Sequence, residues 1–179
     1  MDYTETLVKQ LCGYKGLITN TRLDRVALTN GEHSLREVVE HPGGVTILAI
    51  DENGFVFCVR QYRYAMSEHL LELPAGKLEP GENPLECAKR ELSEETGISA
   101  GAFVALGKIY PSPGYCQETI YIYMASDLQY GEAHPDENEL LDVEKIHINE
   151  LHRCALDNTI TDAKTIVAIL RAKAVLDAK

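Results

Sequence analysis

Three glutamates at positions 91, 94 and 95 carry the clearest chemical signal in this 179-residue sequence. On a helix they fall within an arc of about 100° on one face. Like charges at this spacing destabilise an isolated helix by roughly a few tenths of a kcal/mol per pair, and the C-terminal end of a helix disfavours anions further. Mg²⁺ would resolve the repulsion, because it takes oxygen ligands from a few carboxylates and from substrate phosphates. The spacing predicts a magnesium site, although charge alone leaves a solvated acidic face as an equal alternative.

The segment around these glutamates has the start and stop signals of a helix over residues 83–96. Asn83 is a good N-cap, and Pro84 occupies the first helical position, where its missing N–H costs nothing. Gly97 suits a glycine C-cap. Arg90 lies beside the glutamates and can hold a carboxylate in a bidentate pair. The helix should therefore present the acidic groups in a fixed direction.

The elements that must position this helix are strands followed by helices. Strands are expected at residues 17–28, 35–41, 45–50, 55–60, 69–73, 103–110, 119–125 and 143–148, and further helices at 149–157 and 162–178. This order indicates an α+β fold with a mixed-sheet sandwich and disfavours a parallel βαβ fold. The break at Pro42-Gly43-Gly44 divides the chain into an N-terminal β segment, residues 1–42, and a main domain, residues 43–179.

Composition excludes several classes of function. The net charge of -11 argues against nucleic acid or an anionic membrane as the main partner, but not against a phosphate substrate held through a metal ion. The five cysteines form no CxxC pair, so they are expected to be free thiols in a reducing cytoplasm and not a zinc or redox site. The first residues show neither a signal peptide nor a membrane span.

Residues 76–98 carry a specific pattern, namely Gly76, Glu82 and the run Arg90-Glu91-Leu92-Ser93-Glu94-Glu95-Thr96-Gly97-Ile98. This pattern resembles the Nudix box at every defining position. At roughly 7% frequency per residue type, its seven fixed positions would match by chance on the order of 10⁻⁸ per start site. The resemblance implies a Nudix-type α/β/α sandwich with a mixed sheet in residues 43–179, plus a small antiparallel β segment in residues 1–42.

Other motifs resemble the ADP-ribose pyrophosphatase branch of this family. They are the lead-in Glu72-Leu73-Pro74-Ala75-Gly76, the turn Ser112-Pro113-Gly114, Arg36-Glu37-Val38-Val39 and Gln61-Tyr62-Arg63. The resemblance implies Mg²⁺-dependent hydrolysis of the ADP-ribose diphosphate to AMP and ribose 5-phosphate, with Mn²⁺ as a substitute. It also implies a homodimer in which the 1–42 segment helps to build the nucleoside site.

Roles for individual residues follow from the same resemblance. The implied metal ligands are the carbonyl of Ala75 and the carboxylates of Glu91, Glu95 and Glu94. Glu82 and Arg90 would orient them. The implied base is Glu139, with Glu137 as second choice, and Glu94 and Arg90 complete the catalytic set. The implied substrate-binding residues are Arg36, Arg63, Glu72, Pro113 and Gly114.

Alternatives remain open at several of these positions. Taken by itself, Arg63 is as compatible with an exposed edge strand as with a phosphate ligand, and the acidic loop at 136–139 would be a solvated turn in most proteins. Tyr14, Tyr62 and Tyr115 compete as the aromatic that stacks on a base. Alternative functions are hydrolysis of another nucleotide sugar, such as GDP-mannose, and a non-catalytic nucleotide-binding sensor.

Overall fold

The computed structural model describes residues 2–134 and 140–178. The chain forms two compact units. The first comprises Met1–Gly43 and Tyr110–Thr119, and the second comprises Gly44–Ile109 and Ile120–Lys179. The predicted N-terminal segment, residues 1–42, therefore lies within the first unit, together with ten residues that come much later in the chain.

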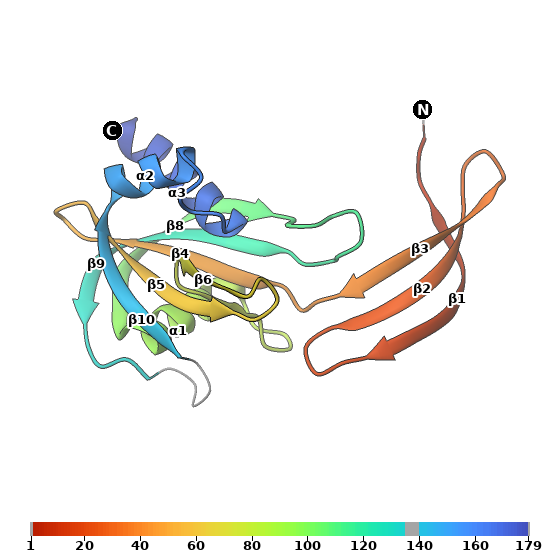
Figure 1. Cartoon of the computed structure of the whole chain (residues 1–179), viewed down its shortest axis with the longest axis horizontal. Helices are drawn as coiled ribbons and strands as arrows, with labels where there is room; N and C mark the ends of the chain where they lie inside the picture. Colours follow the sequence, from red (N-terminus) through yellow and green to blue (C-terminus); the bar gives the residue numbers. More distant parts are fainter. Residues whose placement is uncertain (1, 135–139, 179) are drawn as a thin grey trace. The chain divides into compact units, whose positions relative to one another are not determined.

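The first unit is a three-stranded antiparallel sheet in the order β1, β2, β3 (Figure 1), where β1 is Thr6–Lys15, β2 is Asn20–Ala27 and β3 is His33–Glu40. The strands expected at 17–28 and 35–41 form the antiparallel pair β2 and β3, and Gly31 turns the chain between them with φ 87°, which glycine adopts without strain. The expectation of only two strands is wrong, because β1 was missed. All ten residues of β1 are exposed, so its sequence shows no buried face.

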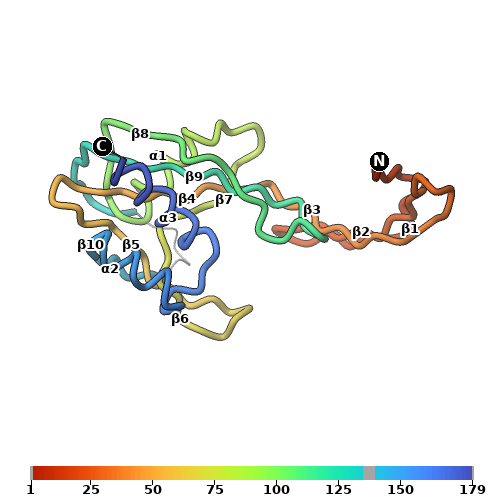
Figure 2. Tube along the Cα trace, turned by 90° about the horizontal axis from the view of Figure 1, so that it is seen from above, coloured from red at the N-terminus to blue at the C-terminus, as the bar shows by residue number. Residues whose placement is uncertain are grey.

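The segment 110–119 extends this unit along β3 (Figure 2). The N–H of Val39 donates to the carbonyl of Tyr115 at 2.7 Å, and the N–H of Gln117 donates to the carbonyl of Val39 at 2.9 Å. The predicted turn Ser112-Pro113-Gly114 therefore lies in the same unit as Arg36.

The second unit contains a seven-stranded sheet in the order β10, β5, β4, β9, β8, with β6 paired to β5 and β7 paired to β4. The β4–β9 pair is parallel and the other pairs are antiparallel, so the predicted mixed sheet is confirmed. The strands are β4 Gly44–Ile50, β5 Phe55–Arg63, β6 Glu68–Glu72, β7 Ala75–Lys77, β8 Ile98–Ile109, β9 Ile120–Tyr130 and β10 Leu141–His147.

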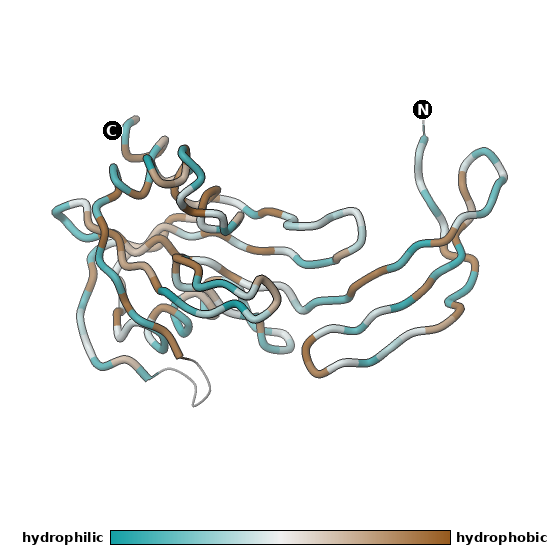
Figure 3. The backbone as a smooth tube through the Cα atoms, viewed as in Figure 1, coloured by the Kyte–Doolittle hydropathy of each residue, from teal (hydrophilic) through white to brown (hydrophobic). Residues whose placement is uncertain are grey.

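Helices cover both faces of this sheet, as the sandwich prediction requires (Figure 1). The helices are α1 Pro84–Thr96, α2 Ile148–Leu156 and α3 Ala163–Asp177. Alternate residues of β4 point to opposite faces of the sheet. Ile47 lies in the same apolar cluster as Leu92 of α1, and Leu48 lies in the same cluster as Ile169 of α3. All seven residues of β4 are buried, and Figure 3 shows this central strand largely as apolar. No helix in the described ranges is both long and apolar enough to cross a membrane.

The caps of α1 match the sequence prediction. The Asn83 side chain accepts a hydrogen bond from the N–H of Leu85 at 2.9 Å, and Pro84 opens the helix. Gly97 ends it with φ 70°, and its N–H donates to the carbonyl of Ser93 at 2.9 Å. The helix is thus capped at both ends, independently of the contacts that its acidic side chains make.

Candidate active site

Two of the box glutamates are buried where α1 meets β7. Glu91 is 9% exposed and Glu95 is 3% exposed. The N–H of Ala75 donates to the Oε2 atom of Glu95 at 3.1 Å. A Cβ atom at Gly76 would lie 1.8 Å from the Cδ atom of Glu91, so only glycine leaves room for that carboxylate. The short strand β7 therefore sets the positions of both carboxylates, one through a hydrogen bond and one through the absence of a side chain.

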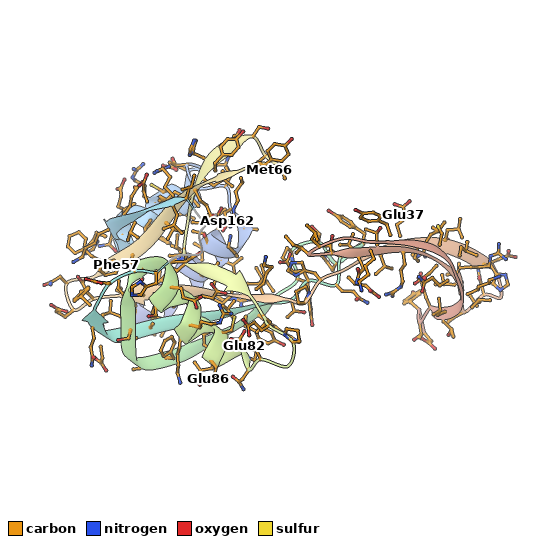
Figure 4. The ribbon with its side chains drawn as sticks, turned by 90° about the horizontal axis from the view of Figure 1, so that it is seen from below. Glu37, Phe57, Met66, Glu82, Glu86 and Asp162 are labelled. Atoms are coloured by element: carbon orange, nitrogen blue, oxygen red, sulfur yellow. The ribbon has the colours of Figure 1, made fainter. Side chains whose placement is uncertain are left out.

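Arg90 joins the remaining acidic groups of the helix. Its Nη1 atom donates to Glu91 at 2.8 Å and to Glu94 at 2.9 Å. Its Nε and Nη2 atoms donate to the two carboxylate oxygens of Glu82, both at 3.0 Å. Figure 4 marks Glu82 just before α1 and Glu86 on its first turn. The bidentate pair with Glu82 fixes the plane of the guanidinium, which in turn holds the side chains of Glu91 and Glu94.

These contacts keep Glu82 and Arg90 charged. The hydrogen bond from Arg90, assisted by the backbone N–H of Glu79, lowers the pKa of Glu82 to about 2. The pKa of Arg90 is raised above its usual value, first by the hydrogen bond to Glu82 and then by the neighbouring glutamates. The guanidinium and the Glu82 carboxylate therefore stay charged at any physiological pH.

The donor set fits a hard divalent cation. Glu91 and Glu95 offer carboxylate oxygens from successive turns of α1, and Ala75 offers a backbone carbonyl from β7. Within residues 2–134 and 140–178, no group of three or more His, Cys, Asp or Glu side chains is gathered to enclose an ion. Mg²⁺ is commonly held by one or two carboxylates, several waters and the phosphates of a substrate.

A second charged cluster surrounds Glu72, at the end of β6. Glu72 is wholly buried. Arg63 donates to its two carboxylate oxygens, from Nε at 2.6 Å and from Nη2 at 2.7 Å. The Nζ atom of Lys164 also donates to the Oε2 atom of Glu72, and it lies 3.0 Å from the Oδ1 atom of Asp162. The predicted residues Arg63 and Glu72 thus come together, and Lys164 is a member that the sequence analysis missed.

The electrostatics of this cluster favour its charged form. Burial opposes ionisation of Glu72, but the hydrogen bonds from Arg63 and Lys164 outweigh burial and lower its pKa. The pKa of Arg63 is raised, first by the hydrogen bond to Glu72 and to a smaller extent by the charges of Asp162 and Glu95. Arg63 is therefore within electrostatic reach of the box glutamate Glu95.

The first unit contains a pocket of about 410 Å³. Its lining residues are Glu5, Arg22, Arg36, Glu37, Val38, Pro113, Gly114, Tyr115, Cys116 and Gln117. The pocket brings together three predicted substrate-binding residues, Arg36, Pro113 and Gly114. The guanidinium of Arg36 donates to the carboxylate of Glu5 and, at 2.8 Å, to the hydroxyl of Ser34.

The predicted site residues thus form two groups, one in each unit. The second unit holds Arg63, Glu72, Ala75, Glu82, Arg90, Glu91, Glu94 and Glu95, and the first holds Arg36, Pro113 and Gly114. The two candidates for the catalytic base, Glu137 and Glu139, lie outside the described residues.

Known proteins resemble this chain along most of its length. A model of the NUDIX domain matches residues 40–168. An ADP-ribose pyrophosphatase of Bacillus subtilis (strain 168) is 35% identical over 170 residues, covering 93% of this chain and 92% of the relative. A methanol dehydrogenase activator of Bacillus methanolicus is 36% identical over 169 residues, covering 93% and 91%. A solved structure described as an ADP compounds hydrolase superimposes with a TM-score of 0.85 at 22% identity, covering 97% of this chain and 95% of that one.

Proposed function

The chain belongs to the NUDIX domain family, and from this membership we propose that it is an ADP-ribose pyrophosphatase, releasing AMP and ribose 5-phosphate. The observation that carries the proposal is the intact box, in which Arg90 holds Glu82, Glu91 and Glu94 while β7 contacts Glu91 and Glu95. The 35% identity to the Bacillus subtilis ADP-ribose pyrophosphatase, over nearly the whole of both chains, supports the choice of substrate.

The metal in this proposal is Mg²⁺, with Mn²⁺ as a substitute. Glu91, Glu95 and the carbonyl of Ala75 would hold it, and Glu94 would assist from the neighbouring position on α1. When bound, the ion would place positive charge beside the diphosphate oxygens and lower the pKa of a water molecule. Arg90 contributes by fixing the carboxylates of Glu91 and Glu94, so that they need not reorganise when substrate arrives.

Bond cleavage in the proposal is an in-line attack of water on one phosphorus atom of the diphosphate. A carboxylate of the 136–139 loop takes the proton, and by the family resemblance Glu139 is the first candidate and Glu137 the second. Arg63 binds the phosphates, and Glu72 supports Arg63 from its buried position. By the family resemblance Arg36 also contacts the phosphates, and Pro113 and Gly114 bind substrate; all three line the pocket of the first unit.

We propose that the working form is a homodimer in the cytoplasm. The three-stranded sheet leaves large apolar side chains in water: Leu7 is 57% exposed, Val8 51% and Tyr14 71%. A sheet of this size needs a packing partner to be stable, and a second copy of the same sheet offers a matching apolar surface. All five cysteines are free thiols, as a reducing compartment would keep them.

The test is hydrolysis by the purified chain of ADP-ribose, GDP-mannose, NADH, diadenosine polyphosphates and 8-oxo-dGTP. Each substrate is incubated with Mg²⁺ and, separately, with a chelator. Release of AMP from ADP-ribose that the chelator abolishes supports the proposal. Faster turnover of another panel member would keep the diphosphate chemistry and replace the substrate.

A second candidate is a non-catalytic nucleotide-binding sensor. The observation in its favour is the 36% identical relative of Bacillus methanolicus, which is named as an activator of methanol dehydrogenase. Complete lack of metal-dependent turnover, combined with nucleotide binding in calorimetry, would establish this candidate in place of the first.

A further inference from the structure

Glu72 has more cationic partners than its single charge requires. Both of its carboxylate oxygens accept from Arg63, and Oε2 also accepts from Lys164. The three side chains differ in exposure, at 1% for Glu72, 12% for Lys164 and 40% for Arg63. Lys164 therefore neutralises Glu72 from the buried side, while Arg63 approaches it from the side that faces solvent.

The position of Lys164 is fixed by the start of α3. Its ammonium pairs with Asp162 at 3.0 Å, and Asp162 caps the helix by accepting from the N–H of Thr165 at 3.0 Å. The hydroxyl of Thr165 in turn accepts from the N–H of Leu73 at 2.9 Å. This chain of bonds ties Lys164 to the residue that follows Glu72, so the Lys164–Glu72 pair holds its place whatever Arg63 does.

This redundancy matters if Arg63 binds phosphate. An arginine that is the only partner of a buried carboxylate cannot leave it, because the carboxylate would remain as an uncompensated buried charge. With Lys164 in place, Glu72 keeps one cationic partner, shared with Asp162, after Arg63 turns away. The guanidinium, which is partly exposed and already feels the charge of Glu95, can then pair with an anion beside the box.

Building on the proposed function, we propose that Lys164 is a positioning residue: it keeps the buried carboxylate of Glu72 neutralised so that the guanidinium of Arg63 can exchange Glu72 for the diphosphate of the substrate. Lys164 acts through Glu72 and does not touch substrate. Its loss would bind Arg63 more firmly to Glu72 and weaken substrate binding, while the carboxylates of α1 keep their arrangement.

The first experiment measures KM and kcat for ADP-ribose with Mg²⁺. For Lys164→Gln we expect KM to rise about tenfold with kcat within about twofold of wild type. Lys164→Arg, which keeps the charge, should return KM to within about threefold of wild type. Glu72→Gln combined with Lys164→Gln removes both charges, frees Arg63, and should also bring KM back to within about threefold. Lys173→Gln, which breaks an ion pair with Asp177 near the other end of α3, is the matched control and should leave both constants unchanged.

Two results would overturn the inference. An unchanged KM in Lys164→Gln would show that Arg63 does not depend on Lys164. A KM that stays high in the double variant would show that Lys164 contacts substrate directly. If Lys164→Gln does not fold, the charge-balanced double variant still gives the deciding KM.

A second experiment needs no turnover, so it separates this inference from the proposed function. Urea unfolding is measured for Arg63→Gln in the wild-type and in the Lys164→Gln backgrounds. With Lys164 present, we expect Arg63→Gln to change the unfolding equilibrium constant by about tenfold or less, and in its absence by about a hundredfold or more. Equal effects in the two backgrounds would sink the inference, even if ADP-ribose proves to be the substrate. Absence of ADP-ribose hydrolysis by the wild type would instead count against the proposed function alone.

Discussion

Arg90 combines two tasks that a lysine could not perform together. Its planar guanidinium spans the two oxygens of Glu82 through Nε and Nη2, while Nη1 reaches Glu91 and Glu94. The like-charge repulsion expected on this face of α1 is thereby reduced by a cation from the same helix. Glu95 is oriented separately, by the backbone of β7.

At the residue scale, Glu95→Gln tests the proposed metal ligand. The amide keeps the size of the side chain but removes the charge, so we expect kcat/KM for ADP-ribose to fall by roughly a hundredfold or more. AMP release is the measurement. Glu86→Gln is the control, because Glu86 lies on the same helix, is exposed, and pairs with Lys89. Equal activity of the two variants would remove Glu95 from the metal site.

The lowered pKa of Glu82 predicts how the stability of the protein should depend on pH. Its pKa in the folded chain is about 2, below the ordinary value of 4.5, so ionisation favours the folded state. This contribution is fully present above pH 4.5 and is lost as the pH falls from 4.5 towards 2. We expect Glu82→Gln to be less stable than wild type at pH 7, and the difference to vanish near pH 2. Urea titrations across this range measure it, and a difference that does not change with pH would contradict the assignment.

At the scale of elements, the contact between β7 and α1 decides the geometry of the site. A Cβ atom at position 76 would overlap the carboxylate of Glu91, which is the far end of a flexible side chain and can move away. We therefore expect Gly76→Ala to fold with a modest loss of stability but to lose most of its AMP-releasing activity. Gly131→Ala is the control, since the nearest atom to its Cβ would be the carbonyl oxygen of Gly97 at 3.3 Å. Normal activity of Gly76→Ala would show that Glu91 need not occupy its present position.

The sequence predicted those elements whose signals are local. The caps of α1 and the apolar run of β4 identified both correctly, because a capping side chain and a continuous buried strand leave direct marks on the chain. Strand β1 was missed because none of its residues is buried, so it lacks the alternation that identifies a half-buried strand. Strand β7 was missed because three residues are too few to show a period.

The candidate site was likewise predictable only where its residues are close together in the sequence. The box residues are close in sequence and share one helix, so helical geometry places them together. Lys164 and Glu72 are 92 residues apart, and a single lysine near the start of a helix gives no sign of its partner. Such contacts depend on the tertiary packing of α3, which local patterns do not encode.

At the scale of the whole molecule, the exposed strand β1 predicts the oligomeric state. We expect the wild type to sediment as a dimer, and Leu7→Asp combined with Val8→Asp to sediment as a monomer, because the charges cannot be buried in the sheet contact. Analytical ultracentrifugation is the measurement, and the circular dichroism of the variant should remain that of a folded protein. As a control, Leu156→Asp changes an exposed apolar residue of α2 and should leave the dimer intact. A wild-type monomer at micromolar concentration would refute the proposed assembly.

The first unit is built from two separate segments of the chain, and this affects the order in which the protein folds during translation. The N-terminal sheet is synthesised first, yet the backbone bonds from Tyr115 and Gln117 to β3 can form only after more than half of the chain has been made. Helix α1 and its glutamates emerge in the interval. We therefore expect the first unit to mature only after α1 has emerged, but before the second unit, whose β9, β10, α2 and α3 are synthesised last.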